Sequence, residues 1–256
     1  MQTTRRIFAA MTAILLTCAL AAQEGPQLYN LSFDTWNKKN GVWYPFEKDA
    51  PASHRIWDSA NPGLGTFGIN TTTPEYEHVA VRGKGKAAAR IESRKVAWAF
   101  ISGSLYNGHF IRVVDLNGVE TELGAQFNSR PRSLSGYYHY LPAKINHSSK
   151  EYSSYEGKSD EAMIEIILVD WDKPYRQNSS RDGFIDSEND PHIIGIASYM
   201  IKKGTSGYVQ FEAPFKYRSS KTPRYAVFTI TSSRLGGFGT GATGTVLYVD
   251  EFKFNY

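Results

Sequence analysis

The sequence is almost free of cysteine. Its only cysteine, Cys18, lies near the N-terminus, in a segment (residues 15–18) that loosely resembles a bacterial lipoprotein box. Thr17 fits that box poorly, so we favour simple cleavage after residue 22 over lipidation at Cys18. The mature protein then has no cysteine, which excludes disulfides, a cysteine nucleophile and thiolate metal ligands. A chain of this length can bury a core without covalent cross-links.

Neither basic nor acidic residues are in large excess. The 29 basic and 25 acidic residues give a net charge of +4, and removing Arg5 and Arg6 with residues 1–22 leaves 27 minus 25, or +2. No run of Lys and Arg in the mature chain is dense, so we expect no nucleic-acid partner. No later hydrophobic stretch is long enough to cross a bilayer, so we expect no transmembrane span.

Local motifs of the common hydrolases and metalloenzymes are missing. The sequence has no Gly-x-Ser-x-Gly, no His-Glu-x-x-His and no Walker loop, and its six histidines are scattered. We therefore favour a non-catalytic protein over an enzyme. A pair of glycosidase carboxylates stays an alternative, because their separation is set in space rather than in sequence.

Residues 1–22 have the features of a secretory signal peptide. Arg5 and Arg6 precede an apolar stretch at residues 7–20, and small residues at 19–22 offer cleavage sites. This pattern predicts export to the periplasm, to the outer-membrane surface or out of the cell. Residues 23–256 show no Ser/Pro linker and no fixed internal repeat, which predicts a single domain.

Alternation with a period of two dominates the mature chain. At residues 209–215, for example, Val, Phe, Ala and Phe alternate with Gln and Glu. No segment keeps a helical period over three turns. Short strands between frequent turn residues are typical of a sandwich or barrel, and we favour one all-β sandwich. Strands are predicted at residues 87–93, 110–114, 135–141, 164–171, 193–201, 209–215, 225–232 and 246–254.

Two of these strands carry more specific predictions. Residues 164–171 are apolar on both faces, which predicts a central strand that is covered on both sides, with Trp171 in the core. In the last strand, strict alternation predicts that Tyr248, Asp250, Phe252 and Phe254 share one face.

Three long loops separate the strands. Residues 143–161 are rich in Ser, Lys and Glu, residues 173–192 are acidic, and residues 234–244 are glycine-rich. Long loops of this kind are usually functional or mobile. The acidic loop lacks the ligand order of an EF-hand, so we favour a solvated loop over a calcium site there.

The segment Trp57-Asp58-Ser59-Ala60-Asn61-Pro62-Gly63 is the most informative part of the chain. An aromatic ring, a carboxylate and an amide precede a Pro-Gly break, which ends a strand and begins a loop. Loops at the end of a rigid sheet often carry binding groups. A flat ring with polar groups around it suits a sugar, although a buried structural turn would use similar residues. Trp98 and Tyr106 also lie near strand or loop ends and are further aromatic candidates for facing a ligand.

Several segments form an ordered set. They are residues 30–36, 57–63, 88–91, 103–110, 131–142 and 247–252. In this order they resemble the putative carbohydrate metabolism domain of Gram-negative gut bacteria and, more distantly, carbohydrate-binding jelly rolls. The resemblance implies an exported jelly-roll β-sandwich of two antiparallel sheets, linked to glycan capture at the cell surface. Such modules often hold a structural calcium between the first and last strands, and Asp34 and Asp250 fall in the matching places.

The resulting hypothesis is an exported protein that binds a glycan without transforming it. Trp57 or Tyr106 would stack on a sugar ring, while Asp58, Asn61 and His109 would hydrogen-bond its hydroxyls. Association with outer-membrane or other surface proteins is a further expectation. The alternatives are a glycoside hydrolase or polysaccharide lyase on a jelly-roll fold, and a structural or adhesin-type surface protein that binds another protein.

Overall fold

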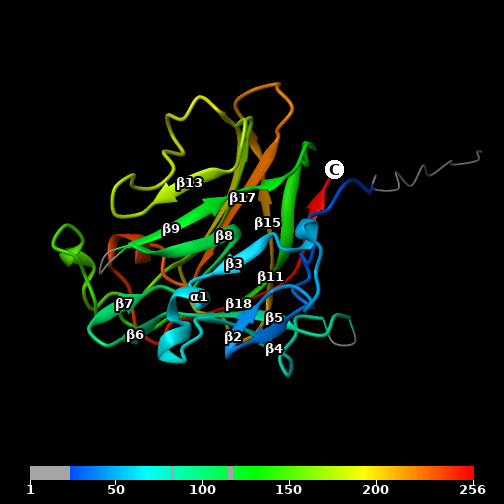
Figure 1. Cartoon of the computed structure of the whole chain (residues 1–256). Coiled ribbons are helices and arrows are strands. Elements are labelled where there is room, and N and C mark those ends of the chain that lie inside the picture. Colours follow the sequence, from blue (N-terminus) through cyan, green and yellow to red (C-terminus); the bar gives the residue numbers. More distant parts are fainter. Residues whose placement is uncertain (1–23, 82–83, 115–117) are drawn as a thin grey trace, which may run out of the picture.

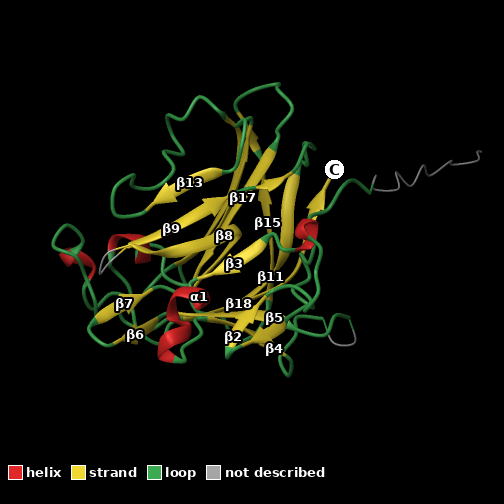
Figure 2. Cartoon of the chain, in the orientation of Figure 1, coloured by secondary structure: helices red, strands yellow, loops and turns green. Residues whose placement is uncertain are grey.

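The computed structural model describes residues 24–81, 84–114 and 118–256, so the predicted signal peptide and Cys18 lie outside the described residues. Nearly all regular structure consists of strands, and the helices are single turns (Figure 2). They are α1 (Asn61–Leu64), η1 (Ala52–His54), η2 (Gly65–Phe67), η3 (Ser153–Tyr155) and η4 (Gly236–Phe238). None of the helices in these ranges is long and apolar enough to cross a membrane.

The larger layer is a nine-stranded sheet whose named neighbours all pair antiparallel (Figure 1). Its main order is β13-β9-β8-β17-β12-β14-β16; β3 also pairs with β8, and β10 with β17. The strands are β3 (Trp57–Ser59), β8 (Ser104–Val114), β9 (Gly118–Leu123), β10 (Ala125–Gln126), β12 (Ala162–Val169), β13 (Tyr175–Asn178), β14 (Ile193–Ile201), β16 (Lys216–Tyr217) and β17 (Tyr225–Thr231).

The second layer is a five-stranded antiparallel sheet in the order β15-β11-β18-β5-β4. Its strands are β4 (Thr72–Glu75), β5 (Ala88–Glu92), β11 (Ser133–Leu141), β15 (Val209–Pro214) and β18 (Val246–Asn255). Two small hairpins complete the fold, β1 (Asn37–Lys39) with β2 (Val42–Tyr44) and β6 (Arg94–Val96) with β7 (Ala99–Ile101). The two large sheets pack face to face, which confirms the predicted jelly-roll β-sandwich.

The main core lies between the two sheets and is rich in aromatic rings. Phe33, Trp57 and Phe228 are fully buried there, and Phe252 and Phe254 lie against them. Full burial of one such side chain contributes roughly 1.5–3 kcal/mol. The described chain contains no disulfide, so hydrogen bonds hold the strands of each sheet together and this aromatic packing holds the two sheets together.

A second apolar cluster covers the outer face of the nine-stranded sheet. Ile167 and Val169 of β12 lie in this cluster, with Trp171 and, from the 173–192 loop, the partly buried Ile185. β12 lies between β17 and β14 and alternates its side chains between the two clusters. The prediction of a central strand covered on both faces, with a buried Trp171, is therefore confirmed.

The prediction for the last strand is wrong in one respect. Phe252 and Phe254 point into the core with Leu247 and Val249, whereas Tyr248 and Asp250 face the other side of the sheet. The reason is Glu251, whose φ of 51° marks a bulge where the pairing of β18 with β11 shifts. One inserted residue reverses the alternation along a strand.

Candidate functional site

The 57–63 segment lies inside the protein. Trp57 has no exposed surface, and its Nε1 donates a hydrogen bond of 2.7 Å to the carbonyl oxygen of Tyr29. Its ring packs against Phe33 and Phe228 at centroid distances of 5.5 and 5.2 Å. Trp57 cannot stack on a sugar as predicted, because no face of its indole is free. It packs in the core instead.

Asp58 has a similar internal role. Its Oδ1 accepts from the backbone N–H of Ser59 and its Oδ2 from that of Phe110, both at 2.8 Å. Burial raises the pKa of Asp58 to about 6, and these two amides oppose that rise. The carboxylate therefore fixes β3 against β8 and has no free oxygen to offer a ligand.

Asn61 joins the layers at the start of α1. Its Nδ2 donates to the carbonyl oxygens of Thr72 at 2.6 Å and Trp43 at 3.0 Å, and its Oδ1 accepts from the backbone N–H of Thr71 at 2.8 Å. Buried backbone groups need such partners. The structural-turn alternative thus accounts for Trp57, Asp58 and Asn61.

Tyr106 lies opposite Asp58 in the pairing of β3 with β8, whereas His109 lies three residues further along β8. Tyr106 is half-buried on the outer face of the nine-stranded sheet, and burial holds the pKa of its hydroxyl well above the usual value. His109 is exposed beyond Gly108, whose φ of 135° marks a change in the path of β8. The structure therefore does not bring the five predicted residues into one open site.

Tyr106 instead belongs to a polar row across four strands. It lies opposite Thr229, which lies opposite Glu165, which lies opposite Ser198. Glu165 is half-buried in the central strand, and burial raises the pKa of its carboxyl group. No cationic side chain in the described ranges forms an ion pair with it. A hydrogen bond from the Ser198 side chain opposite it opposes this rise.

Exposed aromatic side chains gather at one end of the sandwich. Trp98 forms the turn of the β6–β7 hairpin with Ala97, whose φ is 53°, and is 75% exposed. Figure 1 shows this hairpin on the left, with the turn of η4 and the loop that carries η3 at the same end. Phe100 of the same hairpin stacks on His147 at 5.4 Å.

The three long loops supply the other rings of this end. Phe238 lies 5.1 Å from Phe184 and 5.2 Å from Tyr152 between ring centroids. Phe184 and Phe238 are both exposed. We call Trp98, Phe100, Tyr152, Phe184 and Phe238 the aromatic end. Each of the loops at 143–161, 173–192 and 234–244 contributes one ring. The sequence alone did not predict that these three loops meet.

The aromatic end adjoins the polar row. Gly236, at the start of η4, lies directly against Ser102. A Cβ added to Gly236 would be 2.2 Å from the Ser102 Cβ. The hydroxyl oxygens of Ser102 and Thr231 are 2.9 Å apart. Thr231 follows Thr229 by two residues on the same face of β17. The η4 turn therefore adjoins Ser102, whose hydroxyl group connects it to the buried Thr231 at the end of β17.

The predicted calcium ligands lie together but do not form a complete site. Asp34 Oδ1 accepts from the backbone amides of Lys86 and Ala87, and Asp250 Oδ2 accepts from Ala80 N–H at 2.7 Å. Of these carboxylate oxygens, Asp250 Oδ1 is buried without a partner. Within the described residues, no group of three or more His, Cys, Asp or Glu side chains is arranged to hold a metal. Asp34 and Asp250 alone supply fewer oxygen ligands than the roughly six to eight that calcium takes, and the calcium site stays a prediction.

The fold is an antiparallel β-sandwich, and the family match makes it a carbohydrate-related one. The chain belongs to the putative carbohydrate metabolism domain family, whose model matches residues 32–255. No functionally curated protein matches the sequence.

Two solved structures show the same fold at low sequence identity. One is from Bacteroides thetaiotaomicron and is described as a putative glycoside hydrolase; it shares 19% identity over 91% of this chain and 72% of its own, with a TM-score of 0.66. The other, from Bacteroides vulgatus, carries the same description and shares 16% identity over 86% of this chain and 94% of its own, with a TM-score of 0.60.

Proposed function

We propose that this is an exported, non-catalytic carbohydrate-binding protein that captures a glycan at the aromatic end. The observation that carries the proposal is Trp98, an indole 75% exposed at the turn of the β6–β7 hairpin, at the same end of the sandwich as the η4 turn (Figure 1). An exposed side chain of this size forgoes roughly 2–3 kcal/mol of burial free energy. Large exposed apolar surface of this kind marks an interaction site.

The neighbouring polar row suits a sugar better than a purely apolar partner. A sugar ring offers an apolar face to an aromatic ring and hydroxyl groups to polar side chains. Thr229 and Glu165 could accept or donate hydrogen bonds there, next to Ser102 and Thr231. A site with few anchors gives modest affinity, and millimolar to micromolar binding corresponds to about 4–8 kcal/mol.

Export and location belong to the same proposal. The features of residues 1–22 support secretion, and the lack of cysteine in the remaining chain leaves the fold independent of disulfide formation. The protein would act in the periplasm, at the outer-membrane surface or outside the cell, and it could associate there with other surface proteins.

Affinity electrophoresis tests the glycan proposal. The protein is run through gels that contain xylan, glucomannan, galactan or soluble starch, and retardation is followed by calorimetry with the matching oligosaccharide. Trp98→Ala should weaken binding about tenfold, while Tyr76→Ala, another exposed aromatic in a different loop, should leave it unchanged. Equal binding by Trp98→Ala and wild type would remove the aromatic end from the site. If the protein bound none of these glycans, the result would favour the alternative of an adhesin-type surface protein that binds another protein.

An enzyme is the weaker candidate function. Asp58 and Glu165 lie in the same cross-strand row, and burial raises the pKa of both carboxyl groups. Three strand spacings of about 4.8 Å separate them, which is more than the roughly 5–9.5 Å between the two carboxyl groups of a glycosidase. Release of reducing sugar that Glu165→Gln abolishes would establish hydrolysis. Binding without release would support the non-catalytic proposal.

A further inference from the structure

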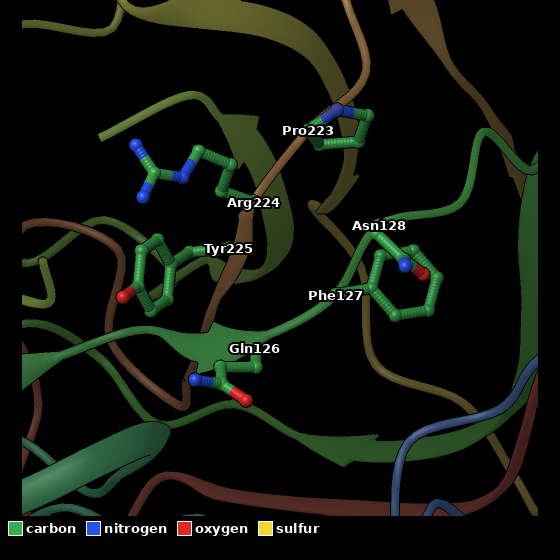
Figure 3. A pocket seen from close by; sticks show the side chains of 6 residues that line it. All are labelled: Gln126, Phe127, Asn128, Pro223, Arg224 and Tyr225. Atoms are coloured by element: carbon green, nitrogen blue, oxygen red, sulfur yellow. The ribbon is translucent and has the colours of Figure 1, made fainter. Parts of the chain in front are cut away.

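A polar hollow lies away from the aromatic end. It has a volume of about 450 Å³. One wall is formed by β10 and the residues that follow it, and the other by the segment that leads into β17. Figure 3 shows the rings of Phe127 and Tyr225 on opposite sides of it, with Gln126 between and below them and Pro223 above. The lining residues are Gln126, Phe127, Asn128, Pro223, Arg224 and Tyr225.

Backbone hydrogen bonds fix the walls of this hollow. Gln126 pairs with Tyr225 in register, and the N–H of Phe127 donates to the carbonyl oxygen of Arg224 at 3.0 Å. The N–H of Arg224 donates in turn to the carbonyl oxygen of Val169 at 2.8 Å. Residues on paired strands hold their side chains more rigidly than residues on free loops. The hollow is thus formed before any ligand arrives.

The lining combines apolar walls with unengaged polar groups. Phe127, Tyr225 and Pro223 are buried, whereas Gln126, Asn128 and Arg224 are exposed. Within the described chain, neither the Gln126 amide nor the Asn128 amide forms a side-chain hydrogen bond. Each amide can both donate and accept, which suits the hydroxyl groups of a sugar.

The charge around the hollow is positive. Residues 216–224 contain four basic and no acidic residues, and residues 128–132 contain two basic and no acidic residues. Arg130 joins these two segments, since its guanidinium lies 4.1 Å from the ring centroid of Tyr217 and its Nη2 donates to the carbonyl oxygen of Ser219 at 2.8 Å. The basic side chains are therefore gathered by the fold and are not free to spread apart.

Arg224 is available to a ligand. Its Nη1 lies 2.5 Å from Asp172 Oδ1, but the Asp172 side chain is 96% exposed. Ion pairs at such exposure contribute little, so a bound anion could replace Asp172 at small cost. The other nearby acid, Asp170, is already paired with Lys221 and His192. A guanidinium presents parallel N–H donors that match a carboxylate or a sulfate.

We propose that this hollow is a second binding site, which takes an anionic sugar residue. Arg224 binds the carboxylate or sulfate group, and the exposed Gln126 and Asn128 amides bind ring hydroxyls above the buried Phe127, Pro223 and Tyr225. The site goes beyond the proposed glycan binding at the aromatic end, and it does not depend on Trp98.

Binding to three polymers tests this site. Polygalacturonate presents carboxylates, chondroitin sulfate presents sulfate as well, and neutral galactan serves as the uncharged probe. We expect wild type to bind at least one anionic polymer, and Arg224→Gln to bind it ten- to a hundredfold more weakly. Arg181→Gln is the matched control, because Arg181 is 77% exposed and paired with Asp182 elsewhere on the surface. Preference between the two polymers identifies the anionic group.

The outcomes separate this site from the aromatic end. Trp98→Ala should keep anionic binding, and Arg224→Gln should keep binding to neutral glycans. Asn128→Ala, which removes an exposed amide and no charge, should weaken anionic binding about two- to fivefold. The proposal is overturned if neither anionic polymer binds, or if Arg224→Gln and Arg181→Gln lose affinity equally, since that pattern reports diffuse electrostatics.

Discussion

Replacement of Asp250 by Asn should stabilise the protein at neutral pH. Asp250 is 1% exposed, its Oδ2 accepts from Ala80 N–H, and its Oδ1 has no partner. Burial raises the pKa of Asp250 to about 7, and the charges of Glu251 and Asp34 add to that rise. Asn keeps an acceptor for Ala80 and replaces the unpartnered, charged oxygen with a neutral NH₂ group.

The sign and size of the effect follow from proton linkage. An unfolded Asp titrates near pH 4, so the folded state binds this proton more tightly by about three pKa units. The free energy of unfolding therefore falls as pH rises from about 4 to about 7 and levels off above that. Three units correspond to about 4 kcal/mol as an upper limit, and relaxation around the group leaves an expected gain of about 2 kcal/mol for Asp250→Asn at pH 8.

Urea denaturation at pH 5, 6, 7 and 8 provides the measurement. The difference in unfolding free energy between Asp250→Asn and wild type should grow with pH, whereas Asp172→Asn, a matched change at an exposed carboxylate, should show a flat difference. A constant or negative difference for Asp250→Asn across this range would refute the reasoning. Repeating the series with millimolar calcium tests the metal prediction, because an ion bound by Asp34 and Asp250 would stabilise wild type and not the variant.

Three further changes test the structural roles described above by urea or thermal denaturation. Trp57→Ala should cost about 3–5 kcal/mol, because it leaves a cavity in the core between the sheets; a loss below about 1 kcal/mol would contradict its packing role. Asn61→Ala should cost about 2–4 kcal/mol by leaving buried backbone groups unpaired, and Asn61→Asp should not restore the donor bonds. Gly108→Ala should cost at least about 2 kcal/mol, since its Cβ would lie 2.0 Å from the carbonyl oxygen of Glu122; unchanged stability would show that β8 can shift.

The strands were predictable because half-buried sheets leave a period-two pattern. Residues 193–201 coincide with β14, and the predictions at 209–215 and 225–232 differ from β15 and β17 by a single residue at the C-terminal end. The pattern failed at Glu251, where a bulge reverses the alternation without any turn residue to announce it. β9 and β13 were missed, because their sequences mix polar and apolar residues; β13 forms the sheet edge and β9 lies next to it.

The site was less predictable than the fold. Trp57 and Trp98 are both aromatic residues near strand ends, yet one is fully buried and the other is 75% exposed. The difference arises from packing against Phe33 and Phe228, which are distant in sequence. The rings of the aromatic end also come from loops far apart along the chain. Of these, only Trp98 could be singled out beforehand, and only as an aromatic near a strand end.

The segments that resemble the family and the segments proposed to bind glycans are largely different parts of the chain. The 57–63 segment joins β3, β4 and β8 through Asp58 and Asn61, so its residue types are needed for assembly of the sandwich. The aromatic end comes from the β6–β7 hairpin and three long loops, which the assembly of the two sheets does not constrain in the same way. Insertions and substitutions in such loops change a surface at little cost to the core. If the aromatic end binds the glycan as proposed, the 57–63 segment serves the scaffold and the loops serve the ligand. Exchanging the 234–244 loop for a short Gly-Ser turn should therefore change glycan binding much more than the unfolding midpoint.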